Sequence, residues 1–215
     1  MLSHIKDNAR IEKRLLDICL ASWILLLSLP ILCVAVVYIW IKDPGPIFFV
    51  QERIGLGGKC FKLYKLRTMN LEKDSHGRLL PDRNRIGPSG ALLRKMSLDE
   101  LPQLLQVILG KMSMVGPRPL LIRYQPYFYE IEKIRFNVLP GITGLAQING
   151  RNTASWDKRL AYDVEYVKKW SFLSDIKILA KTILNVIVSK GVVVDANTIM
   201  MDLDIERTTQ QKSLK

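Results

Sequence analysis

Two adjacent carboxylates, Asp99 and Glu100, stand in a basic segment where a helix is expected to begin. Ser97 and Glu100 have the spacing of a capping box, whereas Pro102 favours a slightly later start, because a proline in the first turn costs no intrahelical hydrogen bond. Either start places Asp99 at a helix N-terminus, where unsatisfied N–H groups favour an ionised carboxylate and attract phosphate. The pair could supply a nucleophile beside an anionic substrate, although acidic residues in a first turn more often serve only as caps.

Two rigid loops, each carrying an arginine, follow this segment. The first is Gly116-Pro117-Arg118-Pro119 and the second runs from Pro140 to Arg151. Because proline flanks Arg118, its loop would lose little conformational freedom on binding, and a guanidinium offers paired donors to phosphate oxygens. Taken singly, such loops are more often turns with a solvated arginine. Together with the two carboxylates they indicate chemistry on a phosphate-bearing substrate.

These motifs, in this order, resemble those of the bacterial sugar transferases, which are small monotopic phosphoglycosyl transferases. The resemblance extends from about residue 13 to residue 190. It rests on the basic and then hydrophobic N-terminus and on the stretches Lys65-Leu66-Arg67-Thr68-Met69, Ser97-Leu98-Asp99-Glu100-Leu101, Gly116-Pro117-Arg118-Pro119, 140–151 and Asp163-Val164-Glu165-Tyr166-Val167. One departure lies in the hydrophobic segment, where several family members place serine directly before proline and this chain reads Ser28-Leu29-Pro30.

The family resemblance implies a reaction and roles for the matching residues. The aspartate at the position of Asp99 attacks the β-phosphate of a UDP-sugar, UMP leaves, and undecaprenyl phosphate then takes the phosphosugar from the aspartyl intermediate. Such a two-step route predicts ping-pong kinetics. By the same matching, Glu100 is expected to bind Mg²⁺, which prefers oxygen ligands. The product would be the first membrane-bound intermediate of a bacterial capsule, O-antigen, exopolysaccharide or glycoprotein.

Basic residues are expected to neutralise the phosphates of the substrate. Arg118 is the first candidate for gripping them. The further candidates are, in decreasing order, Arg94 and Arg151, and then Lys65 or Arg67. Asp163 matches an acidic position of the family, where a structural ion pair and a direct role in the site are equally compatible with the sequence.

An apolar segment without charged residues runs from Ile18 to Ile41. As a straight helix it would be about 36 Å long, enough to cross a bilayer core of about 30 Å. Two features favour a kinked helix that enters one leaflet and returns. Pro30 removes a central hydrogen bond, where Ser28 could satisfy a freed carbonyl, and positive residues flank both ends. Prolines also occur in spanning helices, so the residues alone leave both topologies open, whereas the family resemblance implies the re-entrant one.

The rest of the chain is predicted to complete a mixed, mainly helical α+β fold. Residues 47–51 and 60–66 are expected to pair as a small β-hairpin around a glycine-rich turn, and the polar stretch 70–90 to form a loop over or beside the site. Apolar residues at helical spacing predict helices over 101–112 and 172–187. These amphipathic helices could face a core or lie in the membrane interface.

We therefore expect three segments along the chain. Residues 1–42 would form a basic flank and the re-entrant membrane helix, and residues 43–190 the catalytic domain on the cytoplasmic face. Residues 191–215 lose the apolar pattern and are predicted to form a loosely held tail.

Composition adds constraints on partners and location. The formal net charge is +12, but no zinc-ligand spacing, recognition-helix pattern or aromatic RNA platform accompanies it, so membrane phospholipids rather than nucleic acid are the expected counterpart. The three cysteines Cys19, Cys33 and Cys60 are scattered singly, which fits a reducing compartment. The expected location is the cytoplasmic face of the bacterial inner (plasma) membrane.

Several questions stay open at the level of sequence. No motif encodes which sugar is transferred, and a homo-oligomer is compatible with everything above. A different class of function is also compatible with a basic, membrane-anchored chain, namely a non-catalytic binding subunit of a glycan assembly complex.

Overall fold

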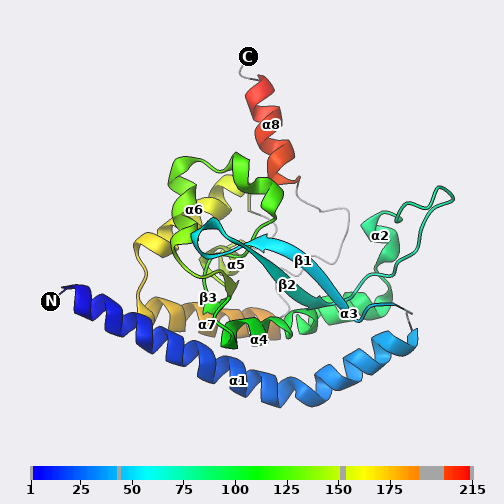
Figure 1. Ribbon diagram of the computed structural model, residues 1–215, viewed down its shortest axis with the longest axis horizontal. Coiled ribbons are helices and arrows are strands. Elements are labelled where there is room, and N and C mark those ends of the chain that lie inside the picture. The colour runs from blue at the N-terminus through cyan, green and yellow to red at the C-terminus, as the bar shows by residue number, and fades with distance from the viewer. Residues whose placement is uncertain (1, 43–44, 151–153, 189–200, 214–215) are drawn as a thin grey trace.

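One long helix, α1 (Leu2–Lys42), runs beneath the rest of the molecule in the computed structural model (Figure 1). The structure describes residues 2–42, 45–150, 154–188 and 201–213. Within them, short helices and two small two-stranded sheets lie on one side of α1. The predicted mainly helical α+β class is therefore confirmed.

Helix α1 continues through Pro30 and is bent along its length (Figure 1). The carbonyl that loses its donor at Pro30 is that of Leu26, four residues earlier. The Ser28 hydroxyl donates instead to the Leu25 carbonyl at 3.2 Å. The prediction that Ser28 satisfies the carbonyl freed by Pro30 is therefore wrong. By length and composition the segment 11–42 could cross a membrane, since it contains an 18-residue window with a mean hydropathy of 2.7, of which 11% is buried. The re-entrant topology stays a prediction.

The predicted hairpin is confirmed. Strand β1 (Phe48–Ile54) pairs antiparallel with β2 (Cys60–Leu66), with Phe48 opposite Leu66 and Ile54 opposite Cys60. A 3₁₀ turn, η1 (Leu56–Gly58), joins them, and the positive φ of Gly57 (65°) and Gly58 (75°) is a conformation that glycine adopts without steric cost. Side chains alternate along β2, so Leu63 and Lys65 lie on one face and Lys62 and Leu66 on the other, and both leucines are buried.

The polar stretch 70–90 is more structured than the sequence predicts. It contains helix α2 (Asp82–Arg85) and the start of helix α3 (Pro88–Lys95), with Pro88 in the first turn of α3 as proline prefers. A Cβ on Gly90 would lie 2.0 Å from the Thr68 carbonyl oxygen. Only glycine lets α3 pack this closely against the chain that leaves β2.

A second sheet brings the two rigid loops together. Strand β3 (Ser113–Val115) pairs parallel with β4 (Gly141–Thr143), although the sequence shows no strand pattern in either segment. A Cβ on Gly116 would lie 2.5 Å from the Leu139 carbonyl oxygen, and one on Gly141 would lie 2.1 Å from the Gly116 nitrogen. The glycines of both loops are thus required by backbone-to-backbone contact.

The remaining elements surround these sheets. Between and after the two strands lie η3 (Ile122–Tyr127), η4 (Glu130–Asn137), α5 (Leu145–Ile148), α6 (Trp156–Lys168) and α7 (Phe172–Ile187). The largest core cluster joins α1, β2, β3, α6, α7 and the short helix α4 (Gln103–Ile108) through buried residues that include Ala21, Leu63, Leu104, Val107, Met112, Val115 and Ile178. These elements are therefore packed together with α1 in one core.

The two predicted amphipathic helices each face two environments. Helix α7 has the predicted bounds, whereas α4 is shorter than the predicted 101–112, because the chain reverses at Gly110 with φ 75°. Helix α4 buries Leu104 and leaves Leu109 69% exposed, and α7 buries Ile178 and leaves Leu184 61% exposed. One flank of each helix therefore faces the core and another carries exposed apolar side chains.

Of the predicted tail, residues 191–200 and 214–215 lie outside the described residues, whereas the described part, 201–213, is mostly helical and packed on the fold. Helix α8 (Leu203–Ser213) begins with Leu203, which is fully buried in a cluster with Tyr124, Phe128 and Trp156. The Trp156 indole donates to the Met201 carbonyl at 2.8 Å. The C-terminal helix is therefore docked on η3 and α6.

Replacing Leu203 with alanine should lower the free energy of unfolding by about 2–5 kcal/mol, because it leaves a cavity beneath α8. Ile205→Ala is a matched control on the same helix, where the side chain is 51% exposed, and it should change that energy by about 0.5 kcal/mol or less. Denaturant unfolding in detergent measures both. Equal effects of the two substitutions would contradict a docked α8.

Candidate active site

The carboxylate pair lies on a short 3₁₀ turn, η2 (Leu98–Glu100), between α3 and α4. Ser97 precedes it with φ 57°, a left-handed conformation that costs a non-glycine residue about 1–3 kcal/mol, and its side chain makes no capping hydrogen bond. The predicted capping box is therefore wrong. The later start is confirmed, because Pro102 is the N-cap of α4. Asp99 thus lies in the turn before α4 and not in the first turn of an α-helix.

Glu100 is held by two cations that contact the same oxygen. Its Oε1 lies 2.6 Å from Lys65 Nζ and 2.7 Å from Arg118 Nη2, and its side chain is only 19% exposed. Burial by itself would raise the pKa of Glu100, but the charges and hydrogen bonds of Arg118 and Lys65 outweigh it and hold that pKa well below its usual range. Glu100 is therefore ionised and fixes both cations beside the turn.

Asp99 is buried next to this ion-pair cluster and is 7% exposed. Burial raises the pKa of Asp99, and the neighbouring Glu100 charge raises it further, whereas Lys65, Arg94 and Arg118 lower it. Among the described residues, no hydrogen bond or ion pair engages its carboxylate. In the described part of the chain, the Asp99 carboxylate thus has three positive charges near it but no direct partner.

The sequence-predicted cations differ in how they are placed. Lys65 and Arg118 meet at Glu100, and Arg94, in the last turn of α3, donates from Nε to the Thr68 hydroxyl at 2.8 Å. Arg67 is buried elsewhere, with its Nη1 2.5 Å from where a Cβ on Gly45 would lie, so the structure does not bring it to the pair. Arg151 lies outside the described residues.

A buried ion pair holds the backbone of Arg118. The Arg118 carbonyl accepts a hydrogen bond from Arg135 Nη2 at 2.7 Å, and the same nitrogen lies 2.9 Å from an Asp163 oxygen. Arg135 and Asp163 are both almost fully buried, and the Arg135 guanidinium also lies 5.4 Å from the Phe128 ring centroid. The structure therefore supports the ion-pair reading of Asp163, which acts on the site through Arg135.

Two further arginines that sequence reasoning did not single out lie near Arg118. Arg53 donates to the Pro119 carbonyl at 3.4 Å and to Gln51 at 2.6 Å, and its Nε is buried without a hydrogen-bond partner. Burial, with the nearby charge of Arg118, lowers the pKa of Arg53 to about 10, and the same two causes lower the pKa of Arg159. No sequence signal marks Arg53, because it reaches the site only through the contact of β1 with residues 119–121.

The carboxylates present fit Mg²⁺ only together with a substrate. Among the described residues, no group of three or more histidine, cysteine, aspartate or glutamate side chains could hold a metal ion. Mg²⁺ is commonly bound through one or two carboxylates plus substrate phosphates and water, and Asp99 and Glu100 supply that number. Both cations on Glu100 contact Oε1, so in the described residues Oε2 carries no ion pair.

Comparison with known proteins places this geometry in a family. Residues 8–189 match the family model described as bacterial sugar transferase. The "Uncharacterized sugar transferase EpsL" of Bacillus subtilis is 50% identical over 182 residues, which are 85% of this chain and 90% of EpsL. The "Exopolysaccharide production protein ExoY" of Rhizobium meliloti is 39% identical over 205 residues, which are 87% of this chain and 90% of ExoY.

A longer relative has a more specific name. The Escherichia coli "UDP-glucose:undecaprenyl-phosphate glucose-1-phosphate transferase" is 39% identical over 192 residues, which are 85% of this chain but 41% of the E. coli protein. The family model ends at residue 189, so α8 lies beyond it.

Asp163→Asn should lower the free energy of unfolding by about 3–5 kcal/mol, because it leaves the Arg135 charge buried without its partner. Glu165→Gln is a matched control on the same helix, since its ion pair with Lys169 is exposed and is worth about 0–1 kcal/mol. Denaturant unfolding measures both. A stable Asp163→Asn variant that has lost catalytic activity would show instead that Asp163 acts directly in the site.

Proposed function

Because this chain belongs to the bacterial sugar transferase family and is a phosphoglycosyl transferase, we propose that it moves a phosphosugar from a UDP-sugar to undecaprenyl phosphate. The observation that carries the proposal is the buried, unpaired Asp99 carboxylate beside the Lys65–Glu100–Arg118 cluster. The name of the E. coli relative supports both substrates. The name of ExoY supports a place in exopolysaccharide synthesis.

In the proposed first step, an oxygen of Asp99 bonds to the β-phosphorus of the donor. The bond from that phosphorus to the bridging oxygen breaks, and UMP leaves with the bridging oxygen and its electron pair. In the second step, a phosphate oxygen of undecaprenyl phosphate attacks the same phosphorus, and the Asp99 carboxylate is released. The products are UMP and undecaprenyl-diphosphate-sugar, and Asp99 needs no proton transfer because it reacts as an anion.

The basic residues of the site suit this chemistry. Phosphoryl transfer depends mainly on positioning and on neutralising charge on the transferred and leaving oxygens. Arg118 is 38% exposed while one of its nitrogens is fixed by Glu100, so the rest of its guanidinium can bind a phosphate oxygen. Lys65 and Arg94 add positive charge around Asp99, and Arg53 adds positive charge near Arg118.

Glu100 is the residue that would hold Mg²⁺ in this proposal, with Asp99 next to it in the chain. When bound there, the cation would add positive charge for the diphosphate oxygens. Lys65 and Arg118 keep Glu100 ionised, which is the form that can ligate a metal.

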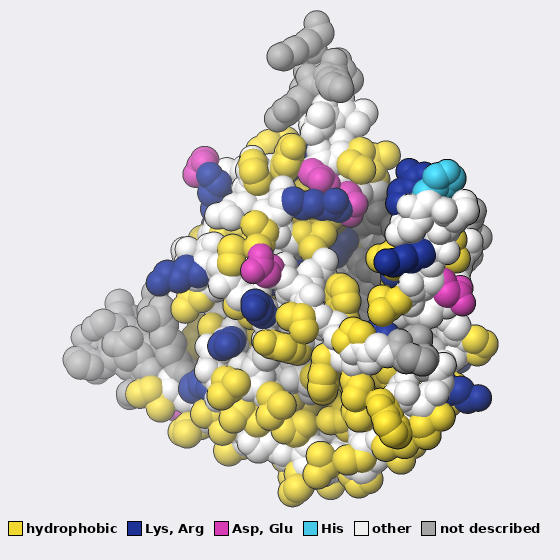
Figure 2. All heavy atoms as spheres, turned by 45° about the vertical axis from the view of Figure 1, so that its right-hand side comes forward, with side chains coloured by type: hydrophobic (Ala, Val, Ile, Leu, Met, Phe, Trp, Pro, Cys, Tyr) yellow, Lys and Arg dark blue, Asp and Glu magenta, His cyan; other side chains and the backbone are white. Residues whose placement is uncertain are grey.

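An exposed apolar surface indicates how the protein would meet its lipid substrate. Figure 2 shows hydrophobic side chains gathered over the lower part of the molecule, the side along which α1 runs. The exposed members from α1, α4 and α7 include Trp23, Leu26, Val34, Trp40, Leu105, Leu109, Leu173, Ile183 and Leu184. A contiguous apolar surface of this kind fits a bilayer, so we propose a monotopic protein whose α1 enters the cytoplasmic leaflet of the plasma membrane and bends at Pro30.

The alternative of a non-catalytic binding subunit is not supported. The B. subtilis and E. coli relatives are named as transferases, and Glu100, next to Asp99 in the chain, pairs with Arg118. A degenerate site would have no reason to keep a buried carboxylate unpaired, because burial of such a group costs free energy.

Asp99→Asn should reduce UMP release by at least about 10³-fold and abolish the covalent phosphosugar adduct, because the neutral amide cannot serve as the nucleophile. UMP release is measured in nanodiscs with undecaprenyl phosphate, Mg²⁺ and a panel of UDP-sugars, and the adduct by intact mass without acceptor. Glu130→Gln, which removes a charge from an 89% exposed side chain, is the control and should leave both unchanged. An adduct that persists in Asp99→Asn would assign the nucleophile to another residue.

The acid limb of the pH profile of kcat/KM should have an apparent pKa above the ordinary range of an aspartate. The reason is that burial raises the pKa of Asp99 and only the ionised form attacks. Lys65→Gln removes the positive charge that lowers this pKa most, so the limb should move to still higher pH. Lys62→Gln is the matched control, since Lys62 is exposed on the other face of the same strand. A limb that stays in place or moves to lower pH in Lys65→Gln would contradict the assignment.

A further inference from the structure

Two consecutive basic residues of α1 reach two different elements of the site. Lys13 Nζ donates to the Val115 carbonyl at 3.0 Å, at the end of β3. Arg14 donates from Nη1 to the Val107 carbonyl at 2.6 Å and from Nη2 to the Ile108 carbonyl at 2.8 Å, at the end of α4. One step along α1 thus separates the contacts to the two segments.

Each of these elements leads directly to one side of the Glu100–Arg118 ion pair. Strand β3 ends at Val115, and Arg118 follows in the rigid loop that begins with Gly116. Helix α4 has six residues, about 9 Å, and begins three positions after η2 ends at Glu100. A shift of the far end of so short a helix would be transmitted to Glu100 with little loss.

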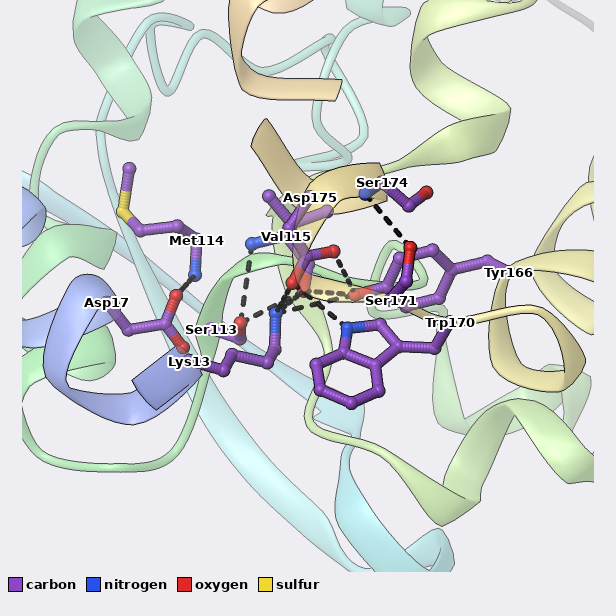
Figure 3. A network of polar contacts seen from close by, with 10 residues as sticks. All are labelled: Lys13, Asp17, Ser113, Met114, Val115, Tyr166, Trp170, Ser171, Ser174 and Asp175. Atoms are coloured by element: carbon purple, nitrogen blue, oxygen red, sulfur yellow. Dashed lines mark hydrogen bonds and ion pairs between the residues drawn. The ribbon is translucent and has the colours of Figure 1, made fainter. Parts of the chain in front are cut away.

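Lys13 is fixed by a network that ties α1 to three parts of the fold (Figure 3). Its ammonium lies 2.5 Å from Asp175 Oδ2 on α7, and Asp175 also accepts hydrogen bonds from the Tyr166 hydroxyl at 2.8 Å and the Trp170 indole at 3.0 Å. One turn further along α1, Asp17 accepts from the Met114 N–H at 3.0 Å. Strand β3 is therefore hydrogen-bonded to α1 through one of its backbone carbonyls and one of its backbone N–H groups.

Arg14 donates to two successive carbonyls in the last turn of α4, and the Val107 carbonyl also accepts from the Gly110 N–H at 3.0 Å. The chain turns away directly afterwards at Gly110, where a Cβ would lie 3.3 Å from Arg14 Nη2. The guanidinium thus lies between α1 and the turn that ends α4, and its two nitrogens define both the distance and the direction of that helix end.

We propose that Lys13 and Arg14 are positioning residues that set where Glu100 stands relative to Arg118, so that the placement of α1 sets the geometry of phosphosugar transfer. This inference rests on the proposed function. Misplacing a reacting group by about 1 Å can cost about 100-fold in rate, and the Glu100–Arg118 contact of 2.7 Å leaves little tolerance. The membrane helix would then act on catalysis through two backbone contacts, in addition to anchoring the protein.

The kinetic test compares Arg14→Gln and Arg14→Lys with the wild type in nanodiscs. Arg14→Gln should lower kcat about 10- to 100-fold with KM for the UDP-sugar within about threefold, because binding groups remain and only alignment is lost. Arg14→Lys, which keeps the charge but not the paired donors, should fall between the two. Lys177→Gln, which removes an exposed charge from α7, controls for membrane attraction and should match the wild type.

A second measurement does not depend on activity. Amide hydrogen exchange should become faster at residues 98–108 in Arg14→Gln and at 113–118 in Lys13→Gln, each without a matching change in the other segment. Absence of UMP release by the wild type would defeat the proposed function and leave this exchange pattern as the test. Unchanged kcat in Arg14→Gln, or exchange that rises uniformly over the molecule, would overturn the positioning role.

Discussion

The geometry of the site depends on one carboxylate oxygen, Oε1 of Glu100, which binds Lys65 and Arg118 together. Three segments far apart in the chain, β2, η2 and the loop after β3, meet at this atom. Burial alone disfavours the charge on Glu100, and the charges and hydrogen bonds of Arg118 and Lys65 together outweigh this effect and keep it ionised. The contact therefore orders the cations that the proposed reaction needs for the donor phosphates.

Helix α1 contacts the elements that carry this ion pair and also faces the proposed membrane. Its first half directs Lys13, Arg14 and Asp17 to β3, α4 and α7 through hydrogen bonds to backbone and side chains. Its second half exposes large apolar side chains, among them Val34 and Trp40. Because α1 continues through Pro30 as one helix, both roles belong to a single element, even though each can be explained from its own residues.

Local patterns predicted the elements better than the contacts between them. Alternation predicted the hairpin and apolar spacing predicted α7, because both patterns arise within one element. The parallel β3–β4 pair could not be predicted, since its strands have three residues each and are separated in the chain by residues 116–140. The capping box at Ser97 failed because the backbone there is left-handed and Ser97 makes no capping hydrogen bond, a conformation that the spacing of Ser97 and Glu100 does not encode.

Asp99 shows why the site needs more positive charge than would balance the two carboxylates alone. Its burial protects a reactive carboxylate from water but raises its pKa, and the negative phosphates of a bound donor would raise that pKa further. The proposed reaction nevertheless requires the ionised form. Lys65, Arg94 and Arg118 offset part of this cost in the free protein, and a cation on Glu100 would offset more once the diphosphate is present. The excess of basic residues around Asp99 thus follows from the charge of the substrate as well as from that of the protein.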